Sequence, residues 1–532
     1  MRVGSFSEHV STYFNLVLET FTDYYPSSAQ NFLPQISSAF SRQELPYNLN
    51  TIYSVVTIVL LVLYLFKRLL HLDQMGEAPL VHMKEEESGV DELQRTSKEE
   101  PKDGAEDTVG ETGAEVEKEV HPMKIIMEKC TVFKSVYKPT WFWGKSGHVQ
   151  TVLFGVMQKP HRAIEVSECK PYFVTLPDTS VVSFHVYEPL KPHQSGEEIT
   201  LLICPGIFGS YNKSYVQSTI GAACARGYRI VCLNHLGVLD EVELKTPRLF
   251  TYGNTEEYAA MCDKVMEMFP DSKFISLGYS MGGNQICKYL GERPERQEKF
   301  VAALSICQGY DCIRAARGLK RWDKMQALYS YILTQRWISL VEKHPIVMQT
   351  AVERGINWKD VKASRGLGQF DYHFSSKYYG YDSFEKFMTE NSCSQHLDKI
   401  DIPLLLINAI DDPLIGPLYH DIPLAVAKKK SNVAFVETHH GGHLGYFEKG
   451  MFYPREVWLD SAILQYCDAA IETMAFKTAS KKTSTSSDTS EDKWQHAADS
   501  ATPGDADMIT NSDSLTIFRS SEFVKSAELK VD

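Results

Sequence analysis

The sequence has no surplus of positive charge and no paired-cysteine motif. Its 532 residues carry 55 Lys and Arg against 68 Asp and Glu, a formal net charge of −13. Nucleic-acid binding needs a basic face to neutralise phosphates, so nucleic acid is not expected as a partner. The eleven cysteines are scattered without a Cys-x-x-Cys pair. We therefore predict no metal site, no cofactor and no disulfide framework, and expect buried reduced thiols.

Long apolar runs are also scarce, and the one of membrane-spanning length lies near the N-terminus. Residues 51–66 (TIYSVVTIVLLVLYLF) continue through Lys67 and Arg68 into LLHL, close to the roughly 20 residues that a spanning helix needs. The run begins too late for a cleaved signal peptide. We expect a single transmembrane helix over 51–72, in the plasma membrane or the endoplasmic reticulum. The positive-inside rule places the following domain in the cytosol, whereas the opposite orientation makes the Asn212 glycosylation sequon usable.

Composition divides the rest of the chain into four parts. Residues 1–50 form a mixed N-terminal region. Residues 73–120 are dominated by Glu, Asp, Lys, Gly and Thr, cannot bury enough apolar surface to order themselves, and are expected to be an acidic disordered linker. Residues 476–532 are rich in Ser, Thr and Asp and are expected to be a disordered tail. One folded domain is therefore predicted over 121–475.

Within this domain short apolar runs alternate with helix-compatible stretches. The predicted strands are 172–176, 182–187, 199–204, 228–233, 273–278, 300–306, 403–409 and 433–438. The later runs are almost continuously apolar, as parallel strands covered on both faces are. The alternation predicts an α/β fold with a doubly wound, mostly parallel sheet. An aromatic-rich helical insertion at about 308–398 has the position and composition of a lid.

The string Gly278-Tyr279-Ser280-Met281-Gly282 follows the strand predicted at 273–278 and precedes a helix-compatible stretch. This strand–turn–helix context is that of a nucleophile elbow. The turn is too tight for large side chains beside the serine, which explains the two flanking glycines. We interpret Ser280 as a nucleophile in preference to a structural turn serine.

A serine hydroxyl needs a positioned base to react at neutral pH, and in this context an acid and then a histidine follow it in the chain. Asp411 and Asp412 compete for the acid, and the Asp-x-x-Ile spacing favours Asp412. His443 ends a Gly-Gly-His loop and is the expected base, in preference to His439 or His440. The buried carboxylate is expected to hold the imidazole in its working tautomer.

The oxyanion of such a reaction needs two fixed donors. We predict the backbone N–H of Met281 and, from the loop 204–210, that of Ile207. Two other strings are rejected. Gly144-Lys145-Ser146 lacks the earlier glycine of a P-loop, and the His-x4-Asp spacing from His235 is of a kind that chance supplies among 17 histidines.

Several segments resemble the alpha/beta-hydrolase domain-containing group of single-pass membrane serine hydrolases. They are GKSGHVQT (144–151), ICPGI (203–207), LNHLG (233–237), PRLFTYG (247–253), GYSMGGNQICKYLGE (278–292), ICQGY (306–310), NAIDDPL (408–414) and HGGHLGYFE (440–448). The resemblance spans most of 125–470. It implies the alpha/beta-hydrolase fold and a catalytic triad of Ser280, Asp412 and His443.

The same resemblance implies a substrate class: acylglycerols and other carboxylic esters, with monoacylglycerols such as 2-arachidonoylglycerol foremost. It also implies response to a steroid ligand, for which the residues themselves give no support. The leading hypothesis is a membrane-anchored serine esterase or lipase. A thioesterase or acyltransferase remains an alternative, since another nucleophile can resolve the same acyl-enzyme. A ligand-binding receptor module with a vestigial site is the alternative from a different class.

Overall fold

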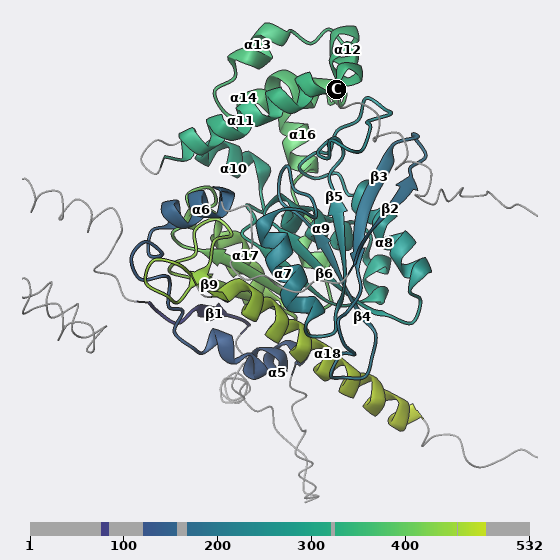
Figure 1. Ribbon diagram of the computed structural model, residues 1–532, viewed down its shortest axis with the longest axis vertical. Helices are drawn as coiled ribbons and strands as arrows, with labels where there is room; N and C mark the ends of the chain where they lie inside the picture. Colours follow the sequence, from purple (N-terminus) through teal and green to yellow (C-terminus); the bar gives the residue numbers. More distant parts are fainter. Residues whose placement is uncertain (1–75, 85–120, 157–167, 321–324, 455, 486–532) are drawn as a thin grey trace, which may run out of the picture. The chain divides into compact units, whose positions relative to one another are not determined.

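The computed structural model describes residues 76–84, 121–156, 168–320, 325–454 and 456–485, which are drawn in colour in Figure 1. The N-terminal region, the transmembrane helix predicted over 51–72, most of the predicted acidic linker and most of the tail lie outside the described residues. Among the residues that are described, no helix is both long and apolar enough to cross a membrane.

Nine strands of the described chain form one sheet in the order β1-β9-β8-β7-β6-β4-β5-β3-β2. Their bounds are β1 Leu80–His82, β2 Cys169–Thr175, β3 Val181–Tyr187, β4 Ile199–Cys204, β5 Arg229–Asn234, β6 Lys273–Tyr279, β7 Phe300–Ile306, β8 Leu404–Ala409 and β9 Val433–Thr438. The six strands from β9 to β5 pair in parallel, while β1, β2 and β3 pair antiparallel at the two edges. The predicted mostly parallel sheet is confirmed.

Helices cover both faces of this sheet, as side-chain alternation along the strands requires. In β4, Leu201 and Ile203 join one buried cluster, whereas Leu202 and Cys204 join the other. The first face is covered by α5 (Pro122–Lys129), α7 (Ser214–Cys224) and α18 (Trp458–Thr485). The second is covered by α8 (Glu256–Met268), α9 (Met281–Glu292) and α17 (Asp421–Lys429). The near-continuous apolar strands are therefore explained by burial on two sides.

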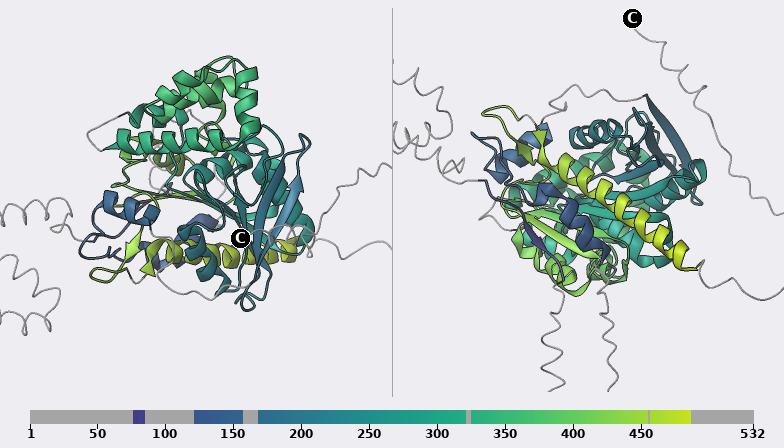
Figure 2. Two further views of the ribbon diagram at one scale, coloured as in Figure 1. Left: turned by 45° about the horizontal axis from the view of Figure 1, so that its top comes forward. Right: turned by 90° about the horizontal axis from the view of Figure 1, so that it is seen from below.

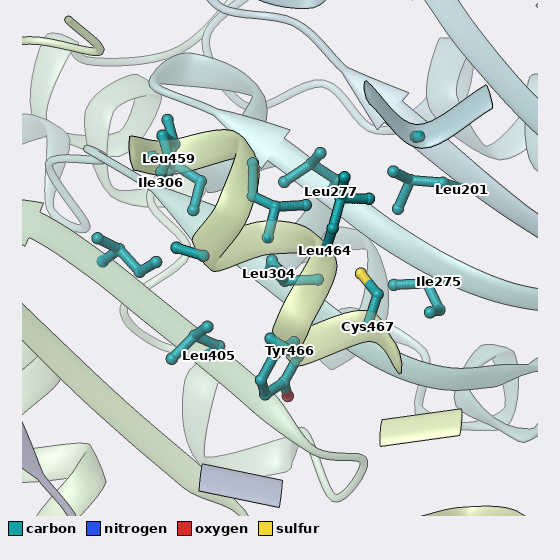
Figure 3. Packing of buried hydrophobic residues seen from close by; sticks show 14 of the residues in the cluster. Leu201, Ile275, Leu277, Leu304, Ile306, Leu405, Leu459, Leu464, Tyr466 and Cys467 are labelled. Atoms are coloured by element: carbon teal, nitrogen blue, oxygen red, sulfur yellow. The ribbon is translucent and has the colours of Figure 1, made fainter. Parts of the chain in front are cut away.

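The helix α18 packs against the first face through buried apolar side chains. Figure 3 shows Leu459, Leu464 and Cys467 of α18 among strand side chains that include Leu277 and Leu304. Figure 2 shows α18 running across the strands with α5 beside it. Apolar burial of this kind contributes about 25 cal/mol per Å², so this interface stabilises the sheet.

A helical insert joins β7 to β8 and lies on one side of the sheet in Figures 1 and 2. It contains α10 Cys312–Gly318, α11 Gln326–Lys343, α12 Pro345–Glu353, α13 Trp358–Ala363, α14 Leu367–Phe370, the π-helical turn η3 Asp371–Ser375, α15 Ser376–Tyr378 and α16 Phe384–Glu390. A separate apolar cluster unites Trp337, Phe370 and Phe374 of the insert with Phe208 and Phe250 of the sheet loops. This insert occupies the interval in which the sequence predicts a lid.

Short elements complete the described fold. They are α6 Gly147–Val156, the hairpin strands β10 Phe447–Glu448 and β11 Glu456–Val457, and the 3₁₀ turns η1 Thr131–Phe133, η2 Pro294–Lys299, η4 Leu397–Lys399 and η5 Pro417–Tyr419. All eleven cysteines are free thiols, ten of them buried, as expected from their apolar sequence surroundings.

The structure corrects the predicted boundaries of the folded domain at both ends. Leu80–His82, assigned above to the disordered linker, is the strand β1 and pairs antiparallel with β9. His82 Nε2 lies 2.8 Å from Glu437 Oε2, and its ring stacks on Phe435. Two apolar residues, Leu80 and Val81, are hidden when composition is averaged over 48 positions rich in charged residues. At the other end, α18 continues to Thr485, past the boundary predicted at 475.

Candidate active site

Ser280 lies at the sharp turn between β6 and α9. Its backbone angles, φ 52° and ψ −118°, belong to a region that residues with a side chain rarely adopt. The Ser280 N–H donates to the Ile306 carbonyl of the neighbouring strand at 2.7 Å. The sheet thus holds a strained conformation that lifts the serine hydroxyl above the carboxyl ends of the strands, as a nucleophile elbow does.

The glycines around Ser280 are required by close backbone contacts. A Cβ atom at Gly282 would lie 2.0 Å from the Cys204 carbonyl oxygen, and one at Gly278 would lie 2.4 Å from the Gly282 oxygen. Gly283 has similarly little space, because its Cβ would meet the Ser305 hydroxyl at 2.4 Å. The prediction that the turn excludes side chains is confirmed by these distances.

The structure brings Ser280, His443 and Asp412 together in one chain of hydrogen bonds. His443 Nε2 lies 2.9 Å from Ser280 Oγ, and His443 Nδ1 lies 2.8 Å from Asp412 Oδ2. An ionised carboxylate only accepts hydrogen bonds, so the imidazole donates from Nδ1 and offers Nε2 to the serine hydroxyl. Asp412 is buried, and its other oxygen accepts the N–H groups of Leu414 and Ile415 at 2.8 and 2.9 Å. These bonds fix the carboxylate facing the imidazole.

Asp411 faces a different group. Its Oδ1 accepts the Gly442 N–H at 2.8 Å, while its Oδ2 is 3.7 Å from His440 Nδ1, too far for a hydrogen bond. Burial raises the pKa of Asp411, and the nearby His440 and the Gly442 N–H partly oppose this shift. Asp411 therefore supports the loop that carries His443. The carboxylate that hydrogen-bonds to His443 is that of Asp412.

The two histidines weighed against His443 have other neighbours. His439 Nε2 lies 3.0 Å from Glu77 Oε2, next to β1. His440 is buried beside Asp411. Of the three, His443 is the one that the described structure hydrogen-bonds to Ser280.

Thr151 of α6 is a site residue that the motif analysis did not single out. Its hydroxyl accepts the His443 N–H at 2.8 Å and donates to the Gly147 carbonyl at 2.6 Å. Gly442, before His443, adopts a positive φ of 56° and approaches Gly147 so closely that a Cβ would lie 2.4 Å from its oxygen. In the sequence alone, the 144–151 segment contains the rejected P-loop string and is part of a resemblance; this contact gives the segment a positional role.

Ile207 and Met281, the predicted oxyanion donors, lie beside Ser280. A Cβ at Gly206 would be 3.3 Å from Ser280 Cβ, which places this loop against the serine. The Gly206 N–H donates to the Tyr215 hydroxyl at 2.8 Å, so it is engaged within the protein, and the predicted donor is the next amide along, that of Ile207. Met281 is the first residue of α9, and amides at that position have no partner within the helix.

Ile207 and Met281 also line a small cavity of about 40 Å³ beneath the insert. Its walls are mainly apolar and include Leu249, Trp337 and Phe374. One acidic group lines it as well. Burial raises the pKa of Asp371 to about 7, although its carboxylate accepts the Ser375 hydroxyl at 2.7 Å. The cavity is thus lined mainly by apolar groups, has room for little more than a water molecule, and holds one carboxyl group whose pKa is raised.

The rejected His-x4-Asp string has no joint site in the structure. His235 Nε2 bonds to the Pro205 carbonyl at 3.0 Å, and burial lowers the pKa of His235 to about 4. Asp240 instead pairs with Lys343. His235 therefore acts as a buried support for the loop that precedes Ile207.

Fold and site together define a hydrolase of the alpha/beta class, and comparison with known proteins agrees. Residues 199–450 match the model of the alpha/beta hydrolase fold family. Monoacylglycerol lipase ABHD2 of Mus musculus is 36% identical over 360 residues, covering 65% of this chain and 83% of the relative. Abhydrolase domain-containing protein 2 of Drosophila melanogaster is 33% identical over 352 residues, covering 65% and 87%. Phospholipase ABHD3 of Mus musculus is 29% identical, covering 66% and 82%.

Among solved structures, the Pyrococcus furiosus esterase Pf2001 is similar to this chain, with 15% sequence identity and a TM-score of 0.36. The match covers 60% of this chain and 98% of the esterase chain. The chain belongs to the alpha/beta hydrolase family. It is a carboxylic ester hydrolase.

Proposed function

We propose that this protein is a membrane-anchored serine lipase that hydrolyses acylglycerols, monoacylglycerols foremost. The observation that carries the proposal is the continuous hydrogen bonding from Ser280 through His443 to the buried Asp412. The apolar side chains that line the small cavity next to Ile207 and Met281 favour an apolar substrate. The relatives named monoacylglycerol lipase support the acylglycerol class.

In the proposed reaction, Ser280 Oγ attacks the ester carbonyl carbon as His443 Nε2 takes the hydroxyl proton. The Met281 and Ile207 amides hold the oxyanion of the tetrahedral intermediate. Asp412 stabilises the imidazolium that forms. When the intermediate collapses, the glycerol oxygen leaves with the proton from His443, and the acyl group remains on Ser280. Water then attacks this acyl-enzyme with His443 again as base, and a fatty acid is released.

Labelling with a fluorophosphonate probe tests the nucleophile. Such a probe bonds covalently to an activated serine, so wild-type protein should be labelled and Ser280→Ala should not. Loss of the attacking oxygen should lower kcat roughly 10⁶-fold. Ser135→Ala, at an exposed position far along the chain, is the matched control and should keep both labelling and turnover. Labelling of Ser280→Ala at the wild-type level would exclude this triad and favour a vestigial site.

Substrate profiling tests the reaction type. Monoacylglycerols, acyl thioesters and an added acyl acceptor alcohol are offered to the same purified enzyme. Free fatty acid from monoacylglycerol should dominate. A larger rate on thioesters, or transfer of the acyl group to the alcohol, would assign the protein to the alternative thioesterase or acyltransferase class. The steroid response implied by family resemblance has no supporting contact among the described residues and is not part of the proposal.

Anchoring through 51–72, with the catalytic domain on the cytosolic side, rests on the apolar run and on Lys67 and Arg68 after it. The test is a pair of truncations. A chain starting at residue 73 keeps β1 and should be soluble, active on a short-chain ester and weak on vesicle-embedded monoacylglycerol. A chain starting at 121 also removes β1 and should lose stability. Equal loss of both activities in the first truncation, or its carbonate-resistant membrane attachment, would contradict the anchor.

A further inference from the structure

A second, larger cavity lies outside the catalytic site, between α11 and the loops that follow β4 and β5. Its volume is about 510 Å³, within the range of small-molecule sites. Phe208 and Lys213 line it from the first loop, and Val238 lines it from the second. The rest of the wall is one face of α11, including Ile332 and Arg336. None of the reaction steps above uses this cavity.

Two cations in this wall have no carboxylate partner among the described residues. Arg336 lies 4.9 Å over the Phe208 ring, a cation–π contact, and forms no ion pair there. The pKa of Lys213 is lowered by partial burial and then by the positive charge of Arg336. Lys343, by contrast, lines the same cavity and is paired with Asp240. Two like charges that face one cavity without a counter-charge repel each other, and a bound anion relieves that cost.

The remaining wall suits a hydrocarbon chain. Ile332 is 48% exposed although it is a large apolar side chain, and Leu340 and Val238 also line the space. A cavity with unpaired cations and apolar side chains matches an anionic head joined to an apolar tail. Neither a free inorganic anion nor a neutral lipid would use both kinds of wall.

An aromatic layer separates this cavity from the one beside Ser280. Phe208 directly follows Ile207, and its ring lies 5.1 Å from Trp337 and 5.8 Å from Phe250, measured between centroids. Trp337 and Phe250 line the smaller catalytic cavity, whereas Phe208 lines the larger one. The two cavities therefore share one wall, and a product leaving the first lies one side chain away from the second.

We propose that the larger cavity binds the carboxylate of a long-chain fatty acid, with Lys213 and Arg336 as its anion-binding groups and the apolar wall holding its chain. This rests on the proposed function, because ester hydrolysis at Ser280 releases such an acid. A guanidinium and an ammonium both form charge-assisted hydrogen bonds with a carboxylate, the guanidinium in a bidentate geometry. The site thereby removes product from the catalytic cavity.

Direct binding to full-length Ser280→Ala protein tests this proposal without turnover. Oleate, kept below its aggregation concentration, is titrated by calorimetry, and neutral oleyl alcohol serves as the uncharged probe. Adding Lys213→Gln and Arg336→Gln together should weaken oleate binding at least about tenfold, as expected for lost charge-assisted bonds. The alcohol should be unaffected. Lys359→Gln, an exposed cation on α13, should leave oleate binding unchanged.

Further measurements distinguish an incorrect pocket assignment from an incorrect proposed function. On the Ser280 background, Lys213→Gln/Arg336→Gln should hydrolyse a soluble short-chain ester within about twofold of wild type, which shows an intact fold. Unchanged oleate binding in that double variant would overturn the pocket assignment. Dodecyl phosphate binding more than about tenfold tighter than dodecanoate would overturn the carboxylate head. Retained oleate binding with no hydrolysis by wild type would overturn the proposed function alone.

Discussion

The turn at Ser280 and the helical insert 312–390 are packed in opposite ways. At the turn, backbone meets backbone: Gly278 and Gly282 leave no space for a Cβ, and the first seven residues of α9 are buried. In the insert, large side chains meet: Trp337 and Phe370 stack with ring centroids 5.6 Å apart. The insert also contributes walls to both cavities and exposes several large apolar side chains.

This contrast separates two tasks within one domain. Backbone contacts have no flexible atoms that can yield, so they fix the reacting groups within small tolerances. Layers of aromatic side chains can repack when one member changes, at a cost that depends on how well the site collapses. Substitutions at the turn should therefore change the catalytic rate for all substrates alike. Substitutions in the insert should instead change which substrates fit.

The largest difference is expected between two adjacent carboxylates. Asp412→Asn should lower kcat roughly 10⁴-fold, the effect of a wrong imidazole tautomer in a serine protease triad. Asp411→Asn keeps an acceptor for the Gly442 N–H and should cost far less. Steady-state kinetics on a soluble ester measures both. A larger loss in Asp411→Asn would show that the reacting conformation differs from the hydrogen bonding described here.

Gly282→Ala tests the rigidity of the turn. The added Cβ would meet the Cys204 carbonyl oxygen at 2.0 Å, so backbone must move and Ser280 with it. A shift of about 1 Å at a reacting group costs on the order of 100-fold in rate. The control is Gly155→Ala in α6, where a Cβ has nothing within 4 Å, and it should keep full activity. Normal turnover by Gly282→Ala would mean that the turn can adapt as the insert does.

Trp337→Leu probes the insert. Removing most of the indole enlarges the cavity beside Met281, and one methylene of fit in an apolar pocket is worth roughly tenfold or more in specificity. We expect kcat/KM to shift by about that factor toward bulkier acyl chains, with turnover of a short ester largely kept. Tyr372→Leu, an exposed aromatic residue of the insert that does not line this cavity, is the control. An equal loss on every chain length would place Trp337 with the rigid catalytic groups instead.

The smallest expected effect is on stability and comes from Asp371. Its pKa of about 7 in the folded state lies above the usual value of about 4 for an unfolded chain. The folded state therefore binds more protons between these values, and stability falls as pH rises from about 4 to about 7, then levels off. Asp371→Asn removes this loss, so it should stabilise the protein more at pH 8 than at pH 5. Urea unfolding at both pH values measures the free energy of unfolding, with the exposed Asp271→Asn as the control. An equal increase in this free energy at both pH values would contradict a raised pKa at Asp371.

Sequence patterns could predict the parts of the fold that depend on local chemistry. Apolar runs such as 199–204 and 403–409 became strands, because burial on two faces leaves no room for polar residues. The spacing from Asp412 to Ile415 also had a physical basis, since the Asp412 carboxylate accepts the amides two and three residues later. Each of these patterns involves residues that lie within a few positions of each other in the sequence.

Other features depend on contacts between distant segments and left no local signal. Thr151 supports the His443 backbone across 292 positions, and neither residue type predicts the other. The meeting of Lys213 with Arg336 arises because α11 packs over the loop after β4. Three residues of β1 are too few to show a period, and they become a strand because the edge of β9 offers unpaired backbone groups.

If residues 51–72 span a membrane as proposed, the strand β1 limits how far the catalytic domain can travel from that membrane. The folded domain begins before the acidic residues 85–120, which therefore connect two of its segments. Between a span that ends at 72 and β1 at Leu80 lie residues 73–79, and fully extended chain reaches at most about 25 Å over that length. This connecting segment is shorter than the thickness of a typical bilayer. A catalytic domain anchored in this way would reach only lipid in its immediate surroundings.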